Sequence, residues 1–187
     1  MILFINACVR KESRTRLLTE YLLKKFNDEI KEINLEKENI LPLDSKTLDL
    51  RTKLAEAGTF DNPIFNYAKD FATADTIVIA APFWDLSFPS SLKCYIEAIN
   101  IIGLTFAYSS EGIPYGLCKA KKLYYVTTSG GKIFNDEYSF GYIKSLCNNF
   151  YGIKDVSYIK AENLDVIGSD VENILRTAEE EIAKQIQ

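Results

Sequence analysis

Short apolar runs alternate along this chain with segments whose apolar residues recur every three or four positions. A continuous apolar run is typical of a strand that is buried on both faces, and residues 76–81 form the clearest one. Residues 30–35 alternate apolar and charged side chains, which favours a strand at the edge of a sheet. Together the runs predict five strands, at residues 2–5, 30–35, 76–81, 123–128 and 156–159.

Helical periodicity separates the predicted strands. The predicted helices cover residues 17–26, 64–71, 92–99, 143–150 and 171–182. Ser13 is placed to cap the first of these helices, and Ser169 with Glu172 has the spacing of a capping box at the start of the last. Region 36–60 is the least regular, and we expect a loop there with a short helix at residues 50–57.

Five strands separated by helices imply a parallel sheet with right-handed crossovers and helices on both faces. The chain has 187 residues, which predicts a single α/β domain over residues 1–187 because most domains have ~100–200 residues. Ligands of such sheets bind at the carboxyl ends of the strands, near the point where the strand order reverses. The loops after the first, third and fourth predicted strands are therefore the first places to look for function.

Composition removes several classes of function. The formal net charge is −4, so we expect no nucleic-acid partner and no anionic membrane, both of which favour a basic surface. The chain contains no histidine, which excludes Ser-His-Asp and Cys-His catalysis and nearly every common zinc site; we expect no metal.

Four cysteines are widely spaced and form no C-x-x-C pair: Cys8, Cys94, Cys118 and Cys147. The chain starts with a strand-like run and not with a signal peptide. Its longest apolar run, residues 77–84, is far shorter than the ~20 residues of a membrane helix. These features predict a soluble, reduced, cytoplasmic protein.

The loop after the first strand carries hydroxyls and cations at the start of a helix. Ser13 and Thr15 lie at that start, beside four basic side chains: Arg10, Lys11, Arg14 and Arg16. Backbone amides and the helix dipole favour a phosphate at such a place. The loop has no glycine, so it is neither a Walker loop nor a G-x-G-x-x-G motif. A phosphate site and an ordinary capped helix both remain open.

The loops after the third and fourth strands suit a flat ligand. Residues 81–91 hold large aromatic side chains between two prolines, which either wall a flat ligand or pack on the core of the protein. Gly130 and Gly131 let the backbone come close to a ligand, although a simple turn would also use them. All three loops converge on one edge of the sheet.

These loops resemble those of the FMN-dependent NADH-azoreductase and NAD(P)H quinone reductase family. The resemblance covers nearly the whole chain and is weakest between residues 36 and 60. The segments that carry it are Ile79-Ala80-Ala81-Pro82, Ser91-Leu92-Lys93, Tyr95, Gly103-Leu104-Thr105-Phe106, Tyr108, Gly112, Gly116-Leu117, Lys121-Lys122 and Thr128-Ser129-Gly130-Gly131.

The resemblance implies a flavodoxin-like, doubly wound sheet with strand order 2-1-3-4-5, and FMN as bound cofactor. The FMN phosphate and ribityl chain are expected at Cys8, Ser13, Arg14 and Thr15. The loop expected under the isoalloxazine ring consists of Pro82, Phe83, Trp84, Asp85 and Leu86, with the Asp85 amide near flavin N5. The pyrimidine side of the ring is expected against Thr128, Ser129, Gly130 and Gly131.

The same resemblance implies an oxidoreductase and no catalytic side chain, because the flavin carries the hydride chemistry. NADH or NADPH would donate two electrons in a ping-pong cycle, and a flat quinone, azo or nitroaromatic compound would accept them. Members of the family are usually homodimers with the substrate site at the interface. Phe106 and Tyr108 are candidates for a wall of that substrate pocket.

Two other functions remain open from the residues alone. Cys8 and Arg14, followed by Thr15, satisfy the C-x5-R spacing and resemble the phosphate loop of low-molecular-weight tyrosine phosphatases. The chain has no Asp-Pro pair for the general acid of that family, and Cys8 also suits a small buried position at a strand end. A non-enzymatic, flavodoxin-type electron carrier is the other alternative.

Overall fold

The computed structural model describes residues 1–186. Its strands are β1 (Ile2–Asn6), β2 (Ile30–Asn34), β3 (Thr76–Ala80), β4 (Phe106–Tyr108), β5 (Pro114–Gly116), β6 (Lys122–Thr128) and β7 (Asp155–Ala161). Its α-helices are α1 (Arg14–Leu23), α2 (Ser45–Glu56), α3 (Asn66–Thr73), α4 (Ser90–Ile99), α5 (Tyr142–Leu146) and α6 (Val171–Ile186). A 3₁₀ turn, Pro63–Phe65, precedes α3, and π-helical turns, Glu137–Gly141 and Cys147–Tyr151, flank α5.

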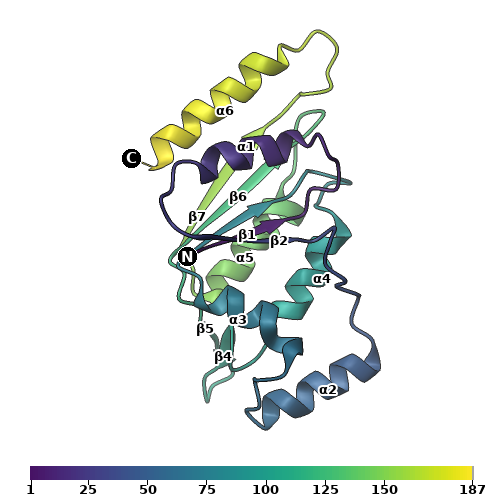
Figure 1. The fold of residues 1–187 in the computed structure, drawn as a ribbon, viewed down its shortest axis with the longest axis vertical. Helices are drawn as coiled ribbons and strands as arrows, with labels where there is room; N and C mark the ends of the chain where they lie inside the picture. The colour runs from purple at the N-terminus through teal and green to yellow at the C-terminus, as the bar shows by residue number, and fades with distance from the viewer. Residues whose placement is uncertain (187) are drawn as a thin grey trace.

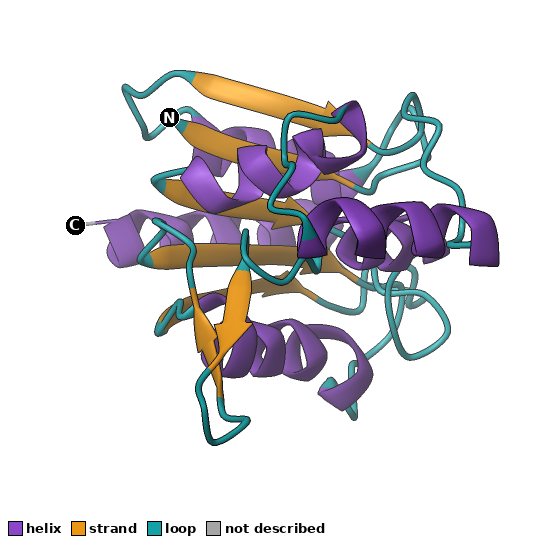
Figure 2. Cartoon of the chain, turned by 90° about the horizontal axis from the view of Figure 1, so that it is seen from below, coloured by secondary structure: helices purple, strands orange, loops and turns teal. Residues whose placement is uncertain are grey.

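The main sheet has five parallel strands in the order β2-β1-β3-β6-β7 (Figures 1 and 2). Counted along the chain, this is the predicted order 2-1-3-4-5, which is confirmed. The order reverses between β1 and β3, whose register places Phe4 beside Val78. The carboxyl ends of β1, β3 and β6 therefore meet at the switch point of the sheet.

Helices cover both faces of the sheet, so the strands are buried on both sides. In β3, Ile77 and Ile79 belong to the core under α3, α4 and α5, whereas Val78 and Ala80 belong to the core under α1 and α6. Figure 1 shows α1 and α6 side by side on one face, and α3 and α4 on the other. This two-sided burial explains why β1 and β3 read as continuous apolar runs.

A short antiparallel hairpin, β4–β5, was not predicted as strand. Each of its strands has only three residues, and Phe106 pairs with Gly116. Because α4 runs back along the sheet after β3, the hairpin lies at the amino ends of the parallel strands (Figure 2). Lys119 N donates a backbone hydrogen bond of 2.8 Å to Ala72 O, which joins the segment after the hairpin to the end of α3.

The cap of α6 and the length of α2 differ from their predictions. Ser169 and Glu172 do not form the predicted capping box, because α6 is capped by Asp170, whose Oδ1 accepts from Asn173 N at 3.0 Å. Helix α2 is longer than predicted and begins after Asp44, whose side chain accepts from Thr47 N. None of the residues of α2 is buried, so its sequence has little of the apolar periodicity that predicts a helix. Among residues 1–186, no helix is both long and apolar enough to cross a membrane.

Candidate functional site

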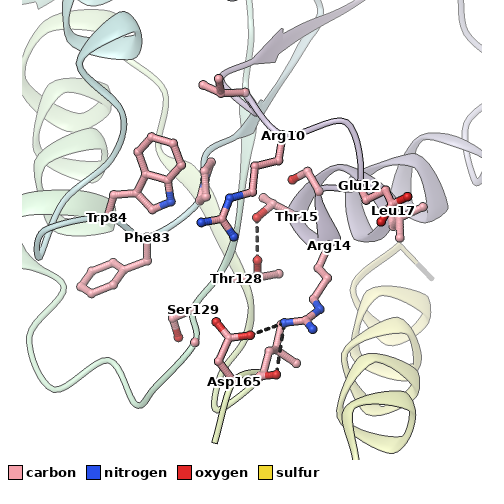
Figure 3. A pocket seen from close by; sticks show the side chains of 15 residues that line it. Arg10, Glu12, Arg14, Thr15, Leu17, Phe83, Trp84, Thr128, Ser129 and Asp165 are labelled. Carbon is pink, nitrogen blue, oxygen red and sulfur yellow. Dashed lines mark hydrogen bonds and ion pairs between the residues drawn. The ribbon is translucent and has the colours of Figure 1, made fainter.

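A cavity of about 540 Å³ opens at the carboxyl ends of β1, β3 and β6 (Figure 3). Its walls come from the three loops that the sequence singled out and from the loop after β7. The residues that line it are Val9, Arg10, Glu12, Ser13, Arg14, Thr15, Leu17, Pro82, Phe83, Trp84, Thr128, Ser129, Gly130, Leu164 and Asp165. It lies where ligands of doubly wound sheets bind.

One end of the cavity is the amino terminus of α1. Ser13 is the N-cap, as predicted, and its Oγ accepts from Arg16 N at 3.3 Å. The Thr15 hydroxyl lies 2.6 Å from the Thr128 hydroxyl, which joins α1 to the end of β6. First-turn amides, the positive end of the helix dipole and two hydroxyls thus face the cavity, a set of groups that favours a phosphate.

The opposite wall is aromatic and belongs to the loop after β3. Phe83 N donates to Thr128 O at 3.0 Å, which extends the pairing of β3 with β6. Two backbone hydrogen bonds close a two-residue turn: Trp84 N donates to Ser87 O at 3.1 Å, and Ser87 N donates to Trp84 O at 2.7 Å. The turn residues Asp85 and Leu86 have φ values of 50° and 64°, a conformation that costs a non-glycine residue ~1 kcal/mol. The turn fixes Trp84 at the wall, while the side chains of Asp85 and Leu86 stay outside the lining.

The floor of the cavity is formed by two loops that are bonded to each other. Leu164 N donates to Ser129 O at 3.2 Å and Asp165 N to Gly130 O at 2.9 Å. Gly130 leaves room for the Asp165 carboxylate, because a Cβ on it would lie 2.5 Å from Asp165 Oδ2 and would displace that side chain. Gly131 does not line the cavity.

An ion pair crosses from α1 to the loop after β7. The Arg14 Nη1 lies 2.7 Å from Asp165 Oδ1 and also donates to Leu164 O at 3.1 Å (Figure 3). Leu164 and Asp165 were not predicted as site residues, although the carboxyl end of the fifth predicted strand meets the same edge of the sheet. Val9, Glu12 and Leu17 were not predicted either, and Arg10 was noted only as one of the basic side chains of its loop.

Cys8 lies behind the cavity and is not part of its lining. Its amide donates to Asn6 Oδ1 at 3.0 Å, and its Sγ lies 3.9 Å from Ala80 O. Burial raises the pKa of the thiol to about 11, and a hydrogen bond with Ser13 opposes only part of that increase. A neutral, enclosed thiol is a poor nucleophile, which disfavours the C-x5-R phosphatase reading.

Phe106 and Tyr108 lie on the hairpin, at the opposite end of the sheet from this cavity. Phe106 is buried and stacks on Phe150 with ring centroids 4.6 Å apart. Tyr108 is 47% exposed. Neither residue lines the cavity of its own chain.

The sequence therefore located most of the cavity. Nine of the predicted cofactor-binding residues line it, namely Ser13, Arg14, Thr15, Pro82, Phe83, Trp84, Thr128, Ser129 and Gly130. Four others, namely Cys8, Asp85, Leu86 and Gly131, belong to the same loops but lie outside the lining.

Comparison with known proteins agrees with this architecture. Residues 1–186 match the family described as flavodoxin-like fold, and the chain belongs to that family. An "FMN-dependent NADH:quinone oxidoreductase 2" from Clostridium acetobutylicum is 39% identical over 196 residues, which cover 98% of this chain and 96% of that protein. An "FMN-dependent NADH:quinone oxidoreductase" from Clostridium perfringens is 38% identical, with 99% and 96% coverage.

Solved structures give the same picture. An azoreductase from Bacillus anthracis superposes with a TM-score of 0.85 at 26% identity, covering 99% of this chain and 97% of that one. An FMN-dependent NADH-azoreductase from Bacillus anthracis, solved in complex with FMN, has a TM-score of 0.77 at 26% identity and covers 100% and 99%.

Proposed function

We propose that the protein is an FMN-dependent oxidoreductase that passes two electrons from NADH or NADPH to a quinone or azo compound. The observation that carries this proposal is the cavity at the switch point, which joins a helix terminus suited to a phosphate to an aromatic wall. The proteins of 38–39% identity that are named for this activity support it, since they match almost the full length of the chain.

The residues of the cavity fit FMN in chemistry and arrangement. Ser13, Thr15 and the first amides of α1 would bind the phosphate, because they present donors at the positive end of a helix dipole. Phe83 and Trp84 would bind the flat ring through their apolar faces. Gly130 would let the backbone approach the edge of the ring. When bound, FMN supplies the hydride chemistry, so the chain needs only to bind and orient it.

The single tryptophan of the chain offers a direct test. Trp84 is 37% exposed and lines the cavity, so a flavin bound there would quench its emission. We expect added FMN to quench tryptophan fluorescence in a saturable way, with one FMN per chain. The Trp84→Phe variant should bind FMN by flavin absorbance while losing the signal. A protein that is colourless as purified and takes up no FMN would contradict the proposal.

We further propose a homodimer in which the hairpin of one subunit borders the cavity of the other. The exposed apolar residues of the hairpin support this arrangement; they are Tyr108, Ile113 and Tyr115, each about half exposed. The resemblance described above favours the same arrangement. Phe106, which is buried, would then support Tyr108 from beneath, since their rings meet edge to face at 5.6 Å.

The Tyr108→Ala variant tests this assembly. We expect it to raise the KM for a quinone about tenfold, because an interface aromatic is worth ~1–2 kcal/mol, with FMN affinity unchanged. Sedimentation of the wild type should give twice the chain mass. A monomeric wild type with full quinone reductase activity would contradict the shared site.

The two alternative functions lack comparable support. The buried, neutral Cys8 thiol argues against a phosphatase, and none of the relatives described above is named as one. An electron carrier would leave the exposed aromatic hairpin without a role.

A further inference from the structure

Four charged side chains line the cavity, and only two of them are paired with each other. Arg14 and Asp165 form the ion pair described above, whereas Arg10 and Glu12 make no ion pair or side-chain hydrogen bond within residues 1–186. A bound FMN brings a phosphate dianion into this space. The question is which arginine neutralises it.

The Arg14 guanidinium already has partners within the protein. Its guanidinium bonds to both Asp165 Oδ1 and Leu164 O, and the backbone of Asp165 is bonded in turn to Gly130. Moving Arg14 onto a ligand would release these contacts. It would also leave the Asp165 carboxylate without a partner beside the incoming phosphate, and two like charges at close range repel.

Arg10 is free to meet a ligand. It lies on the loop between β1 and the Ser13 cap, and its guanidinium points into the cavity between Trp84 and Thr15 (Figure 3). Glu12 lies beside Leu17, to one side of the Arg10 guanidinium (Figure 3). A planar guanidinium presents paired donors that match two phosphate oxygens.

We propose that Arg10, and not Arg14, is the cation that binds the flavin phosphate. Arg14 is a positioning residue that cancels the charge of Asp165 and holds the loop after β7 against the start of α1. This inference rests on the proposed function, and it revises the phosphate role that the family resemblance implied for Arg14.

The test compares the affinities of FMN and riboflavin, which differ by the phosphate alone. In Arg10→Gln we expect the FMN affinity to fall about 10- to 100-fold, the range for a charge-assisted contact, with riboflavin affinity unchanged. Arg10→Lys should retain part of the preference, because it keeps the charge and loses the paired donors. The dependence of FMN affinity on salt should weaken in Arg10→Gln.

Two further variants separate contact from general charge. In the double variant Arg14→Gln/Asp165→Asn, which removes both charges of the pair together, the ratio of FMN to riboflavin affinity should stay within about threefold of wild type. Lys11→Gln changes the same charge one position away, outside the cavity lining, and should also keep the ratio.

Each outcome decides between these assignments. If the ratio of FMN to riboflavin affinity fell in the double variant and stayed unchanged in Arg10→Gln, Arg14 would be the residue that binds the phosphate, and the inference would be overturned. If Arg10→Gln lowered the affinities for FMN and riboflavin equally, Arg10 would contact the ring and not the phosphate. If Lys11→Gln lowered the affinity ratio as much as Arg10→Gln does, the effect would be one of long-range charge and not of contact. Failure of the wild type to bind either flavin would contradict the proposed function itself.

Discussion

Replacing Gly116 by alanine is expected to destabilise the protein more than a change at any other glycine. A Cβ at this position would lie 2.1 Å from the Tyr151 carbonyl carbon and 2.2 Å from Gly152 N. These are backbone atoms at the end of the helical segment after α5, and they cannot move without displacing that segment. Overpacking in a fixed environment costs ~1–3 kcal/mol and occasionally more, and we expect about 3 kcal/mol here.

Urea unfolding of Gly116→Ala measures this effect, with Gly131→Ala as the matched control. The control meets no atom within 4 Å and has no positive φ, so its free energy of unfolding should stay within about 0.5 kcal/mol of wild type. If the two variants were equally stable, the hairpin would not be packed on the Tyr151–Gly152 backbone. Displacement of the hairpin should also weaken the proposed dimer, which sedimentation would report.

The second large effect is a loss of stability at alkaline pH that three buried thiols produce together. Burial raises the pKa of Cys8 to about 11 and that of Cys118 to about 12. Burial likewise raises the pKa of Cys147 to about 12, with a smaller contribution from Cys118. Each thiol is protonated in the folded protein at a pH where the unfolded chain would already have lost the proton.

The sign of the pH dependence follows from these shifts. Because the folded pKa values are raised, the stabilisation is complete below the unfolded value of about 9 and is lost as the pH rises toward 11 to 12. Within this window each thiol lowers the free energy of unfolding by roughly 1.4 kcal/mol per pH unit, and the three thiols together lower it by roughly 4 kcal/mol per pH unit. A typical total of ~5–15 kcal/mol would then be largely lost within two to three pH units.

Urea unfolding between pH 7 and pH 11, in the presence of a reductant, measures this slope. Cys118→Ala removes one thiol from the balance, so its slope between pH 9 and pH 10 should be about one third smaller than that of wild type. Above pH 10 the buried tyrosines add to the slope, because burial also raises the pKa values of Tyr95, Tyr125 and Tyr151. A free energy of unfolding that stays flat from pH 8 to pH 10.5 would show that the thiols are not protected by burial.

Elements with strong local patterns were predictable from the sequence, and weakly patterned ones were not. Strand β3 is apolar throughout because both of its faces are covered, and α4 carries Leu92, Tyr95 and Ile96 at helical spacing toward the core. The hairpin β4–β5 escaped prediction because three-residue strands leave no period to detect. Helix α2 was predicted too short because none of its residues is buried.

The candidate site divides in the same way. Ser13 and Thr15 were found because a capped helix start after a buried strand is a local pattern, and connectivity alone brings it to the same edge as Phe83 and Gly130. Asp165 was missed because no local motif marks it, and only its position after the fifth predicted strand places it at this edge.

By itself, then, the sequence determined the order of elements, the two-sided burial of the sheet and the edge at which the cavity opens, since these depend on residues a few positions apart. Only the tertiary structure decided which charges pair and which remain free. Arg14 and Asp165 are separated by 151 positions, and they meet because the start of α1 and the loop after β7 lie at the same edge of the sheet. The burial that keeps the Cys8 thiol neutral was also decided at this level, because an apolar environment is assembled from side chains distant in the chain.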